Sequence, residues 1–126
     1  MKVTVETPNA PAAVGPYSQG IKANGFLFLS GQIPLNPESG AISAVDIVGQ
    51  TKQVMENLLA VLNSQGLMMS DVVKTTIFMI DLADFGRVND VYGSYFPSDP
   101  PARSTIQVAA LPRGAKIEIE AVAALR

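Results

Sequence analysis

Asn24-Gly25 separates two short apolar runs in GIKANGFLFLSGQ, the stretch from Gly20 to Gln32. This dipeptide is the strongest two-residue signal for a β-hairpin, because a type I′ turn needs positive φ at both central residues. The second run, Phe26 to Leu29, is apolar at every position, so both faces of its strand are expected to be buried. We therefore expect a sheet built around this hairpin, followed by a loop in the Pro/Gly/Asn-rich stretch Ile33 to Gly40.

Apolar residues recur at helical spacing after this loop, from Ala44 to Gln65. They form one stripe, which predicts an amphipathic helix. Ser43 and Asp46 resemble a capping box at its start, and Gly66 stands where a C′ glycine ends many helices. One long helix is therefore expected directly after the hairpin and its loop.

The second half of the chain predicts strand, helix, strand and strand. Val72 to Ile80 is rich in Val, Thr, Ile and Phe, which is typical of a strand. Asp81 is expected to cap a second helix that Pro97 stops, with an apolar side made of Phe85, Val88, Tyr92, Tyr95 and Phe96. Ser104 to Ala109 and Lys116 to Leu125 predict the last two strands.

This order of elements predicts one α+β domain over residues 1–126, a sheet with two helices. Two helices can cover only one face of the sheet, yet Phe26 to Leu29 and Ile77 to Ile80 are apolar on both faces. Charged residues make up only 16% of the chain, against a usual fraction of about 25%. The simplest cover for the second face is another copy of the chain.

Composition excludes several classes of function. The chain contains no cysteine and no histidine, which removes thiolate nucleophiles, Ser-His dyads and Cys/His zinc sites. Proton transfer is then left to a carboxylate, Lys, Tyr or a bound water. The net charge is −2 and the basic residues form no run, which disfavours binding to nucleic acid. The N-terminus lacks an apolar signal core, so a cytoplasmic location is expected.

Polar residues on the last two strands are the first candidates for chemistry. Lys116, Glu118 and Glu120 share one face of their strand because residues two apart point the same way. Arg103 opens the preceding strand after a stiff Pro-Pro lead-in. Taken alone, both patterns also fit a strand whose polar side faces water. Further candidates, each with an equally ordinary structural interpretation, are Tyr17, Ser30, Gly31 and Asn89.

Taken together, four segments resemble the RidA/YjgF family, the reactive intermediate deaminases A. They are APAAVGPYSQG from Ala10, FLSGQIPLNPESG from Phe28, VVKTTIFMIDLADFGRVNDVY from Val72, and PPARSTIQVAALPRGAKIEIEAVA from Pro100. The resemblance covers essentially the whole chain in order. It implies a chorismate-mutase-like α+β fold with both helices on one face, and a homotrimer with a central barrel and clefts between subunits.

The resemblance also implies an activity, the hydrolysis of 2-imino and enamine acids such as 2-aminoacrylate tautomers to 2-oxo acids and ammonia. Arg103 would bind the substrate carboxylate and Glu118 would position the attacking water. Many members have Cys where this chain has Thr105; since that residue would contribute through its backbone, Thr is compatible with the role. The implied substrate-binding residues are Tyr17, Ser30, Gly31, Asn89, Arg103 and Thr105, while the role of Glu120 stays open.

The implied reaction fits the residues available. An iminium carbon is already electrophilic, so neither a metal, a cofactor nor a covalent nucleophile is expected. Two alternatives stay open: a module that senses 2-oxo acids without turnover, and an endoribonuclease or translation inhibitor. The acidic balance of charge and the absence of a basic run weigh against the second alternative.

Overall fold

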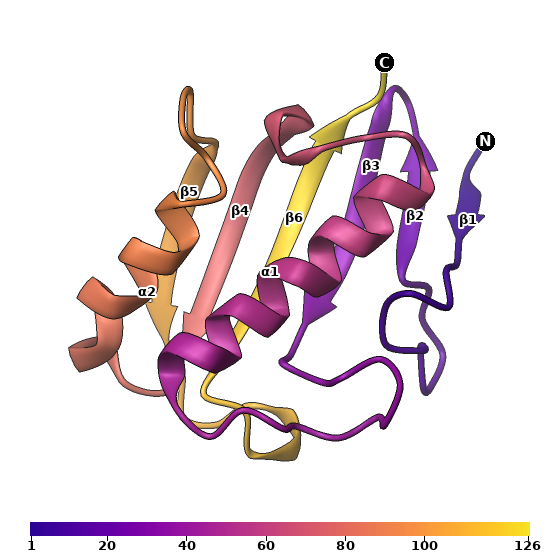
Figure 1. Ribbon diagram of the computed structural model, residues 1–126. Coiled ribbons are helices and arrows are strands. Elements are labelled where there is room, and N and C mark those ends of the chain that lie inside the picture. The colour runs from indigo at the N-terminus through magenta and orange to yellow at the C-terminus, as the bar shows by residue number, and fades with distance from the viewer.

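The computed structural model describes residues 1–126 as a six-stranded mixed sheet with two helices on one of its faces (Figure 1). The strands lie in the order β1-β2-β3-β6-β4-β5. The helices are α1 (Ile47–Ser64) and α2 (Phe85–Gly93), and the strands are β1 (Val3–Val5), β2 (Gly20–Ala23), β3 (Phe26–Gln32), β4 (Val72–Met79), β5 (Ala102–Gln107) and β6 (Ile117–Ala124). The expected α+β class is confirmed, although the short strand β1 was not predicted.

The predicted hairpin is present as β2 and β3, which pair antiparallel around Asn24-Gly25. Asn24 has φ 51° and Gly25 has φ 84°, the left-handed values that a type I′ turn requires. Strand β6 lies in the middle of the sheet, antiparallel to β3 on one side and to β4 on the other. Strand β5 pairs parallel with β4 at the edge of the sheet, after a crossover through α2.

Helix α1 begins one turn later than the expected capping box. Its N-cap is Asp46, whose carboxylate accepts a hydrogen bond from the Gly49 N–H at 2.8 Å. The prediction that Ser43 takes part in the cap is wrong, because the Asp46 carboxylate alone reaches this N–H group. The predicted end is confirmed: Gly66 has φ 70°, and the Leu67 N–H donates to the Leu62 carbonyl as in a Schellman motif.

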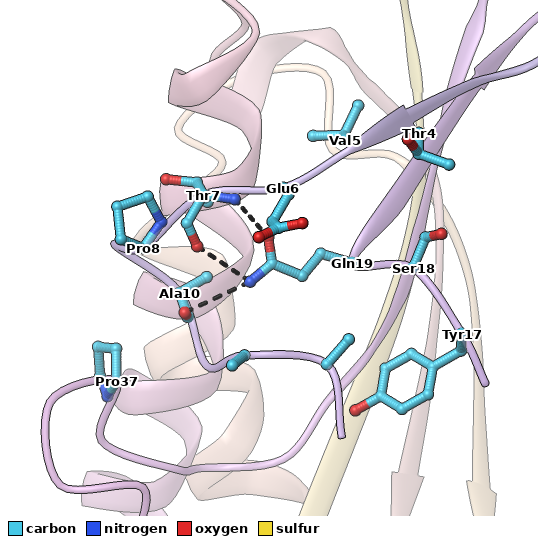
Figure 2. A pocket seen from close by; sticks show the side chains of 12 residues that line it. Thr4, Val5, Glu6, Thr7, Pro8, Ala10, Tyr17, Ser18, Gln19 and Pro37 are labelled. Carbon is cyan, nitrogen blue, oxygen red and sulfur yellow. Dashed lines mark hydrogen bonds between the residues drawn. The ribbon is translucent and has the colours of Figure 1, made fainter. Parts of the chain in front are cut away.

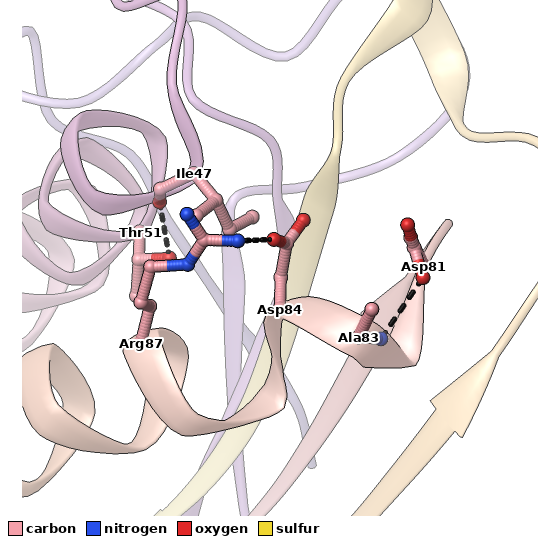
Figure 3. Close-up of polar contacts among 6 residues, drawn as sticks. All are labelled: Ile47, Thr51, Asp81, Ala83, Asp84 and Arg87. Carbon is pink, nitrogen blue, oxygen red and sulfur yellow. Dashed lines mark hydrogen bonds and ion pairs between the residues drawn. The ribbon is translucent and has the colours of Figure 1, made fainter.

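Helix α2 is shorter than predicted at both ends. Asp81 does cap a turn, accepting from the Ala83 N–H at 2.9 Å, but that turn is the 3₁₀ helix η2 (Leu82–Asp84). Figure 3 shows this contact, together with an ion pair between Asp84 and Arg87 across the start of α2. The helix ends at Gly93, before Pro97 can stop it, and turn-type hydrogen bonds carry the chain on to Phe96.

The core lies between the sheet and the two helices. Side chains alternate on β6, where Ile117, Ile119 and Ala121 are buried against the helices and the residues between them point to the other face. The open face carries Phe26 and Phe28, which are 41% and 46% exposed. The expectation that Phe26 to Leu29 is buried on both faces is therefore not met within one chain, because both helices lie on the face that holds Leu27 and Leu29. No helix in the structure combines the length and apolar character needed to cross a membrane.

Candidate functional site

Arg103 lies on the helix side of the sheet, held between strand β5 and helix α2. Its Nη1 donates a hydrogen bond to Oδ1 of Asn89 at 2.8 Å. Its guanidinium carbon lies 5.4 Å from the ring centre of Phe85 and 5.0 Å from that of Tyr92. No carboxylate of the chain forms an ion pair with it. The result is an oriented cation with donors left over, which suits a planar anion.

Tyr92, whose ring lies beside the guanidinium, is held in place by a residue of strand β4. Its hydroxyl shares a 2.6 Å hydrogen bond with Thr75 of β4, the residue directly paired with Arg103. Burial of the Tyr92 phenol raises its pKa, so that it stays neutral under the cation. The Arg103 side chain is therefore held by a hydrogen bond and two aromatic faces rather than by charge.

Thr105 follows Arg103 by two residues and so lies on the same face of β5. Its Oγ1 is buried and has no hydrogen-bond partner, and it is the one buried side-chain polar atom in this condition. Arg103, Asn89 and Thr105, three of the predicted site residues, are therefore gathered at one place on the sheet edge.

Glu118 lies on the opposite side of the sheet, in a pocket of about 570 Å³. It is half-buried, and burial, with a smaller contribution from the charge of Glu120, raises its pKa. The pocket is formed by the end of β3, the N-terminal loop and β6. Its lining residues are Pro11, Ala12, Val14, Tyr17, Gln19, Ser30, Gly31, Gln32, Ile33, Leu35, Pro112, Glu118 and Glu120.

An irregularity in β3 makes room for the Glu118 carboxylate. The β3–β6 register shifts between Leu29 and Gln32, which leaves Ser30 and Gly31 out of regular pairing. A Cβ atom built on Gly31 would overlap Oε2 of Glu118. A side chain at this position would displace the carboxylate, so glycine lets Glu118 lie directly against the β3 main chain.

Tyr17 and Ser30 complete this second cluster. The Ser30 hydroxyl donates to the Ser18 carbonyl at 2.5 Å, and the Tyr17 hydroxyl accepts a 3.3 Å hydrogen bond from the Val14 N–H. Both residues line the pocket that contains Glu118. The structure thus brings together Tyr17, Ser30, Gly31 and Glu118, and adds Glu120 to them.

The seven predicted residues consequently fall into two clusters on opposite faces of the sheet. The Arg103 cluster contacts α2 on the covered face, whereas Glu118 lies between Ile117 and Ile119, both of which point into the core. Within one chain, a small molecule in the Glu118 pocket does not reach Arg103. We refer to these two clusters as the Arg103 and Glu118 candidate half-sites.

Comparison with known proteins identifies the family to which this chain belongs. Residues 7–125 match the model of the family described as endoribonuclease L-PSP. The chain belongs to that family. A 55% identical relative, covering 98% of this chain and 66% of the plant protein, is the chloroplastic Reactive Intermediate Deaminase A of Arabidopsis thaliana. The RidA/YjgF resemblance is thereby confirmed.

Two further members of the endoribonuclease L-PSP family are informative. The 2-iminobutanoate/2-iminopropanoate deaminase of Escherichia coli K12 is 46% identical over the full length of both chains. The crystal structure of Escherichia coli TdcF with bound serine superposes with a TM-score of 0.94 at 41% identity, covering 98% of this chain and 99% of that one. Both the α+β fold and the full-length match therefore agree with the family.

Sequence reasoning within this family missed the aromatic support of Arg103. Phe85 and Tyr92 were assigned to the apolar side of the second helix, although each ring lies within 5.4 Å of the guanidinium. A signal was available, because Phe85, Asn89 and Tyr92 have the i, i+4, i+7 spacing of one helix face. The apolar pocket wall of Pro11, Val14 and Leu35 had no such signal, since it comes from two loops.

Proposed function

We propose that this protein hydrolyses 2-imino and enamine acids, among them 2-iminopropanoate derived from 2-aminoacrylate and 2-iminobutanoate, to 2-oxo acids and ammonia. The observation that carries the proposal is the pair of half-sites, an unpaired guanidinium in one and a half-buried carboxylate with a raised pKa in the other. A 2-imino acid needs both groups, a cation for its carboxylate and a base for the water that attacks C2.

The Arg103 half-site supplies the anchor. A guanidinium can hold a carboxylate through two parallel hydrogen bonds, and such charge-assisted bonds contribute about 1.5–3 kcal/mol each. Asn89 takes one donor and the rings of Phe85 and Tyr92 fix the plane, so the remaining donors are presented in a fixed direction. The substrate carboxylate therefore binds with a defined orientation of C2.

The Glu118 half-site supplies the water. The ionised carboxylate accepts a proton from a water molecule, whose oxygen bonds to C2 of the iminium as the C=N double bond becomes a single bond. The same carboxyl group then returns the proton to nitrogen. As the C–N bond breaks, the carboxylate accepts the proton of the new hydroxyl group, so that the C2 carbonyl forms. The departing ammonia takes this proton from Glu118 and leaves as ammonium, which regenerates the carboxylate. General-base assistance of this kind contributes roughly 10²–10⁴-fold in rate.

A second copy of the chain brings the two half-sites together in this proposal. The exposed apolar face, which contains Phe26, Phe28 and Ile106, offers a surface for that copy. Placing the Glu118 pocket of one chain against the β5 edge of the next would join them. We propose a homotrimer, in which this head-to-tail contact closes on itself after three copies.

The names of related proteins support this proposal, but the family description suggests an alternative function. Relatives are named as imine deaminases, and one structural neighbour holds bound serine, a small amino acid with a carboxylate. The family description names an endoribonuclease instead. The pocket weighs against that activity here, because two carboxylates and no Lys or Arg line it, which would repel a phosphate backbone.

The test is release of ammonia and 2-oxo acid from freshly generated 2-aminoacrylate by the purified protein. Release above the spontaneous rate, with no degradation of RNA by the same preparation, is the expected result. Tight binding of 2-oxobutanoate without any turnover would instead identify a sensing module. RNA degradation that survives repurification and is lost in the Glu118→Gln protein would contradict the proposal.

A further inference from the structure

Gln19 is a buried amide whose side chain is fully used by the N-terminal segment of residues 7–11. Only 3% of it is exposed, and its Oε1 accepts from the Thr7 N–H at 2.6 Å. Its Nε2 donates to the carbonyl oxygens of Thr7 at 3.0 Å and Pro11 at 2.8 Å. Figure 2 shows the amide between Thr7 and Ala10, in the bend that this segment makes. The amide takes the place of a strand neighbour, because β1 has already ended at Val5.

The main chain of Ser18 and Gln19 is hydrogen-bonded to the irregular end of β3, on the side away from residues 7–11. The Ser30 N–H donates to the Gln19 carbonyl at 3.0 Å, and the Ser30 hydroxyl donates to the Ser18 carbonyl. Gln19 therefore connects two pieces of chain that share no other hydrogen bond, the segment 7–11 and the rim at Ser30 and Gly31.

Both connected pieces form walls of the pocket that contains Glu118. Pro11 and Tyr17 line it on the N-terminal side, and Ser30 and Gly31 line it at the strand end. The segment between Pro11 and Tyr17 is otherwise held weakly: Ala12 and Val14 are exposed, and the 3.3 Å bond from Val14 to the Tyr17 hydroxyl is solvent-exposed. Ala10 packs in the core, and the buried bonds of Gln19 are the hydrogen bonds that connect this wall to the rim of β3.

We infer that Gln19 is a positioning residue for the proposed reaction: although it lines the pocket, its amide atoms are bonded to the main chain of residues 7–11, and these bonds set the width of the pocket. This inference rests on the proposed function of the same pocket. Two different parts of the chain then position the two sides of the pocket. Strand β6 and the close approach of Gly31 place Glu118, whereas Gln19 places the wall that faces it.

The side chain must be an amide for this role. Methionine has nearly the same length and fills the space, but leaves the Thr7 N–H and two carbonyl oxygens without partners. A glutamate could still accept from Thr7 and, while protonated, donate to Pro11. Once ionised, however, it would place a negative charge against two carbonyl oxygens.

The main test compares Gln19→Met with Gln50→Met. Gln50 is a matched control: it is also buried, it also bridges two backbone groups, Ala44 and Lys116, and none of these three residues lines the pocket. In Gln19→Met the pocket wall should no longer be held in place. This should weaken 2-oxobutanoate binding and raise KM by about 10-fold or more, while kcat stays within about 3-fold of the wild-type value. Gln50→Met should lower Tm by a similar amount and leave both constants unchanged.

Hydrogen exchange supplies a readout that does not depend on turnover. In Gln19→Met the amides of Thr7 and Ser30 should both exchange faster than in the wild type, while those of β4 and β6 keep their protection. If the wild type binds 2-oxobutanoate but does not hydrolyse imines, the proposed function is wrong. The binding and exchange measurements then still test whether Gln19 positions the pocket wall. Equal binding by the two Met variants, or faster exchange confined to Thr7, would overturn the inference.

Gln19→Glu provides a conservative rescue. Its binding of 2-oxobutanoate, expressed relative to the wild type at each pH, should improve as the pH falls and the new carboxyl group becomes neutral. The ratio is needed because both proteins contain the other carboxyl groups that face this region, Glu6 beside the segment and Glu118 and Glu120 in the pocket. A ratio that does not change with pH would overturn the inference.

Discussion

Arg103 carries a positive charge that no carboxylate of its own chain neutralises, although other charged groups do pair. Arg87 pairs with Asp84, and Arg126 pairs with Asp71. Arg103 instead receives a neutral amide oxygen and two aromatic rings, which orient it without lowering its net charge. At the scale of single residues, this combination leaves the charge of Arg103 without a partner in the chain, as the proposed binding of a substrate carboxylate requires.

Replacing Arg103 tests the anchor. Arg103→Lys keeps the charge but loses the planar fork and should weaken substrate capture by about 1–3 kcal/mol, roughly 5- to 150-fold. Arg103→Ala should abolish both turnover and 2-oxobutanoate binding. For both variants, turnover is measured with enzymatically generated 2-aminoacrylate, and binding of 2-oxobutanoate is measured by calorimetry. Unchanged kinetics in Arg103→Ala would contradict the proposal that Arg103 binds the substrate carboxylate.

The two glutamates should separate by their pH dependence. Glu118 must be ionised to accept a proton, and its raised pKa places the acidic limb of the kcat profile at higher pH than an ordinary Glu would. Glu120→Gln removes the nearby negative charge, so this limb should move to lower pH while kcat on the plateau is kept. Glu118→Gln should lower kcat by about 10²–10⁴ and still bind 2-oxobutanoate. Equal effects of the two changes would contradict these roles.

At the scale of elements, the irregular end of β3 decides where the Glu118 carboxylate lies. Strand β6 is regular through this region, with alternate residues buried against the helices. Strand β3 departs from regular pairing at Ser30 and Gly31, which opens a space on the face that Glu118 occupies. The carboxylate is thus positioned by two strands rather than by a loop.

Gly31→Ala tests this placement. The added methyl group meets the Glu118 carboxylate, so the carboxylate must shift, and kcat should fall by about 10²-fold for a displacement near 1 Å. Gly86→Ala is the control, because a Cβ atom at that position in α2 meets nothing within 4 Å. It should preserve kcat and stabilise the helix by about 1 kcal/mol. Equal kcat in both variants, measured with the same substrate, would contradict the proposed role of the irregularity.

The sequence predicts regular elements better than their ends. Both helices and five of the six strands follow from periodicity and from Asn24-Gly25, because local conformational preference and the burial of one face agree there. β1 is only three residues long and is held by pairing with β2, so its own sequence carries little signal. The capping error at Ser43 has the same origin, since two oxygen-bearing residues three apart compete for one helix start.

The candidate site could be proposed from the sequence as a set of residues, but not as an arrangement in space. Arg103 and Glu118 follow from the motifs that contain them, whereas the register that places them on opposite faces depends on pairing across three strands. The roles of Phe85, Tyr92 and Gln19 arise from contacts between segments distant in the chain. Such contacts leave no local pattern in the sequence.

At the scale of the whole molecule, the uncovered face of the sheet and the divided site point to the same assembly. Phe26, Phe28 and Ile106 are exposed on the face opposite the helices. A surface of this kind is costly to leave in water and is usually an interface.

Light scattering at micromolar concentration should give about three times 13.3 kDa, the count that a closed head-to-tail contact of three copies requires. Phe28→Glu places a charge in the proposed interface and should yield monomers without imine hydrolysis. Val48→Glu is the matched control, since Val48 is similarly exposed, at 42%, but lies on α1, on the helix side. A monomeric wild type with full activity would contradict the assembly.

The most direct measurement of the central claim mixes two inactive variants in one assembly. Arg103→Ala and Glu118→Gln proteins, each inactive alone, are unfolded together in equal amounts, refolded and assayed for hydrolysis of 2-aminoacrylate. If each site takes Arg103 from one copy and Glu118 from its neighbour, about one quarter of the sites receive two intact residues, so about one quarter of wild-type activity should return. If both residues acted within one chain, every site would keep a defect. Absence of any recovered activity, with mixed assemblies present, would contradict the account.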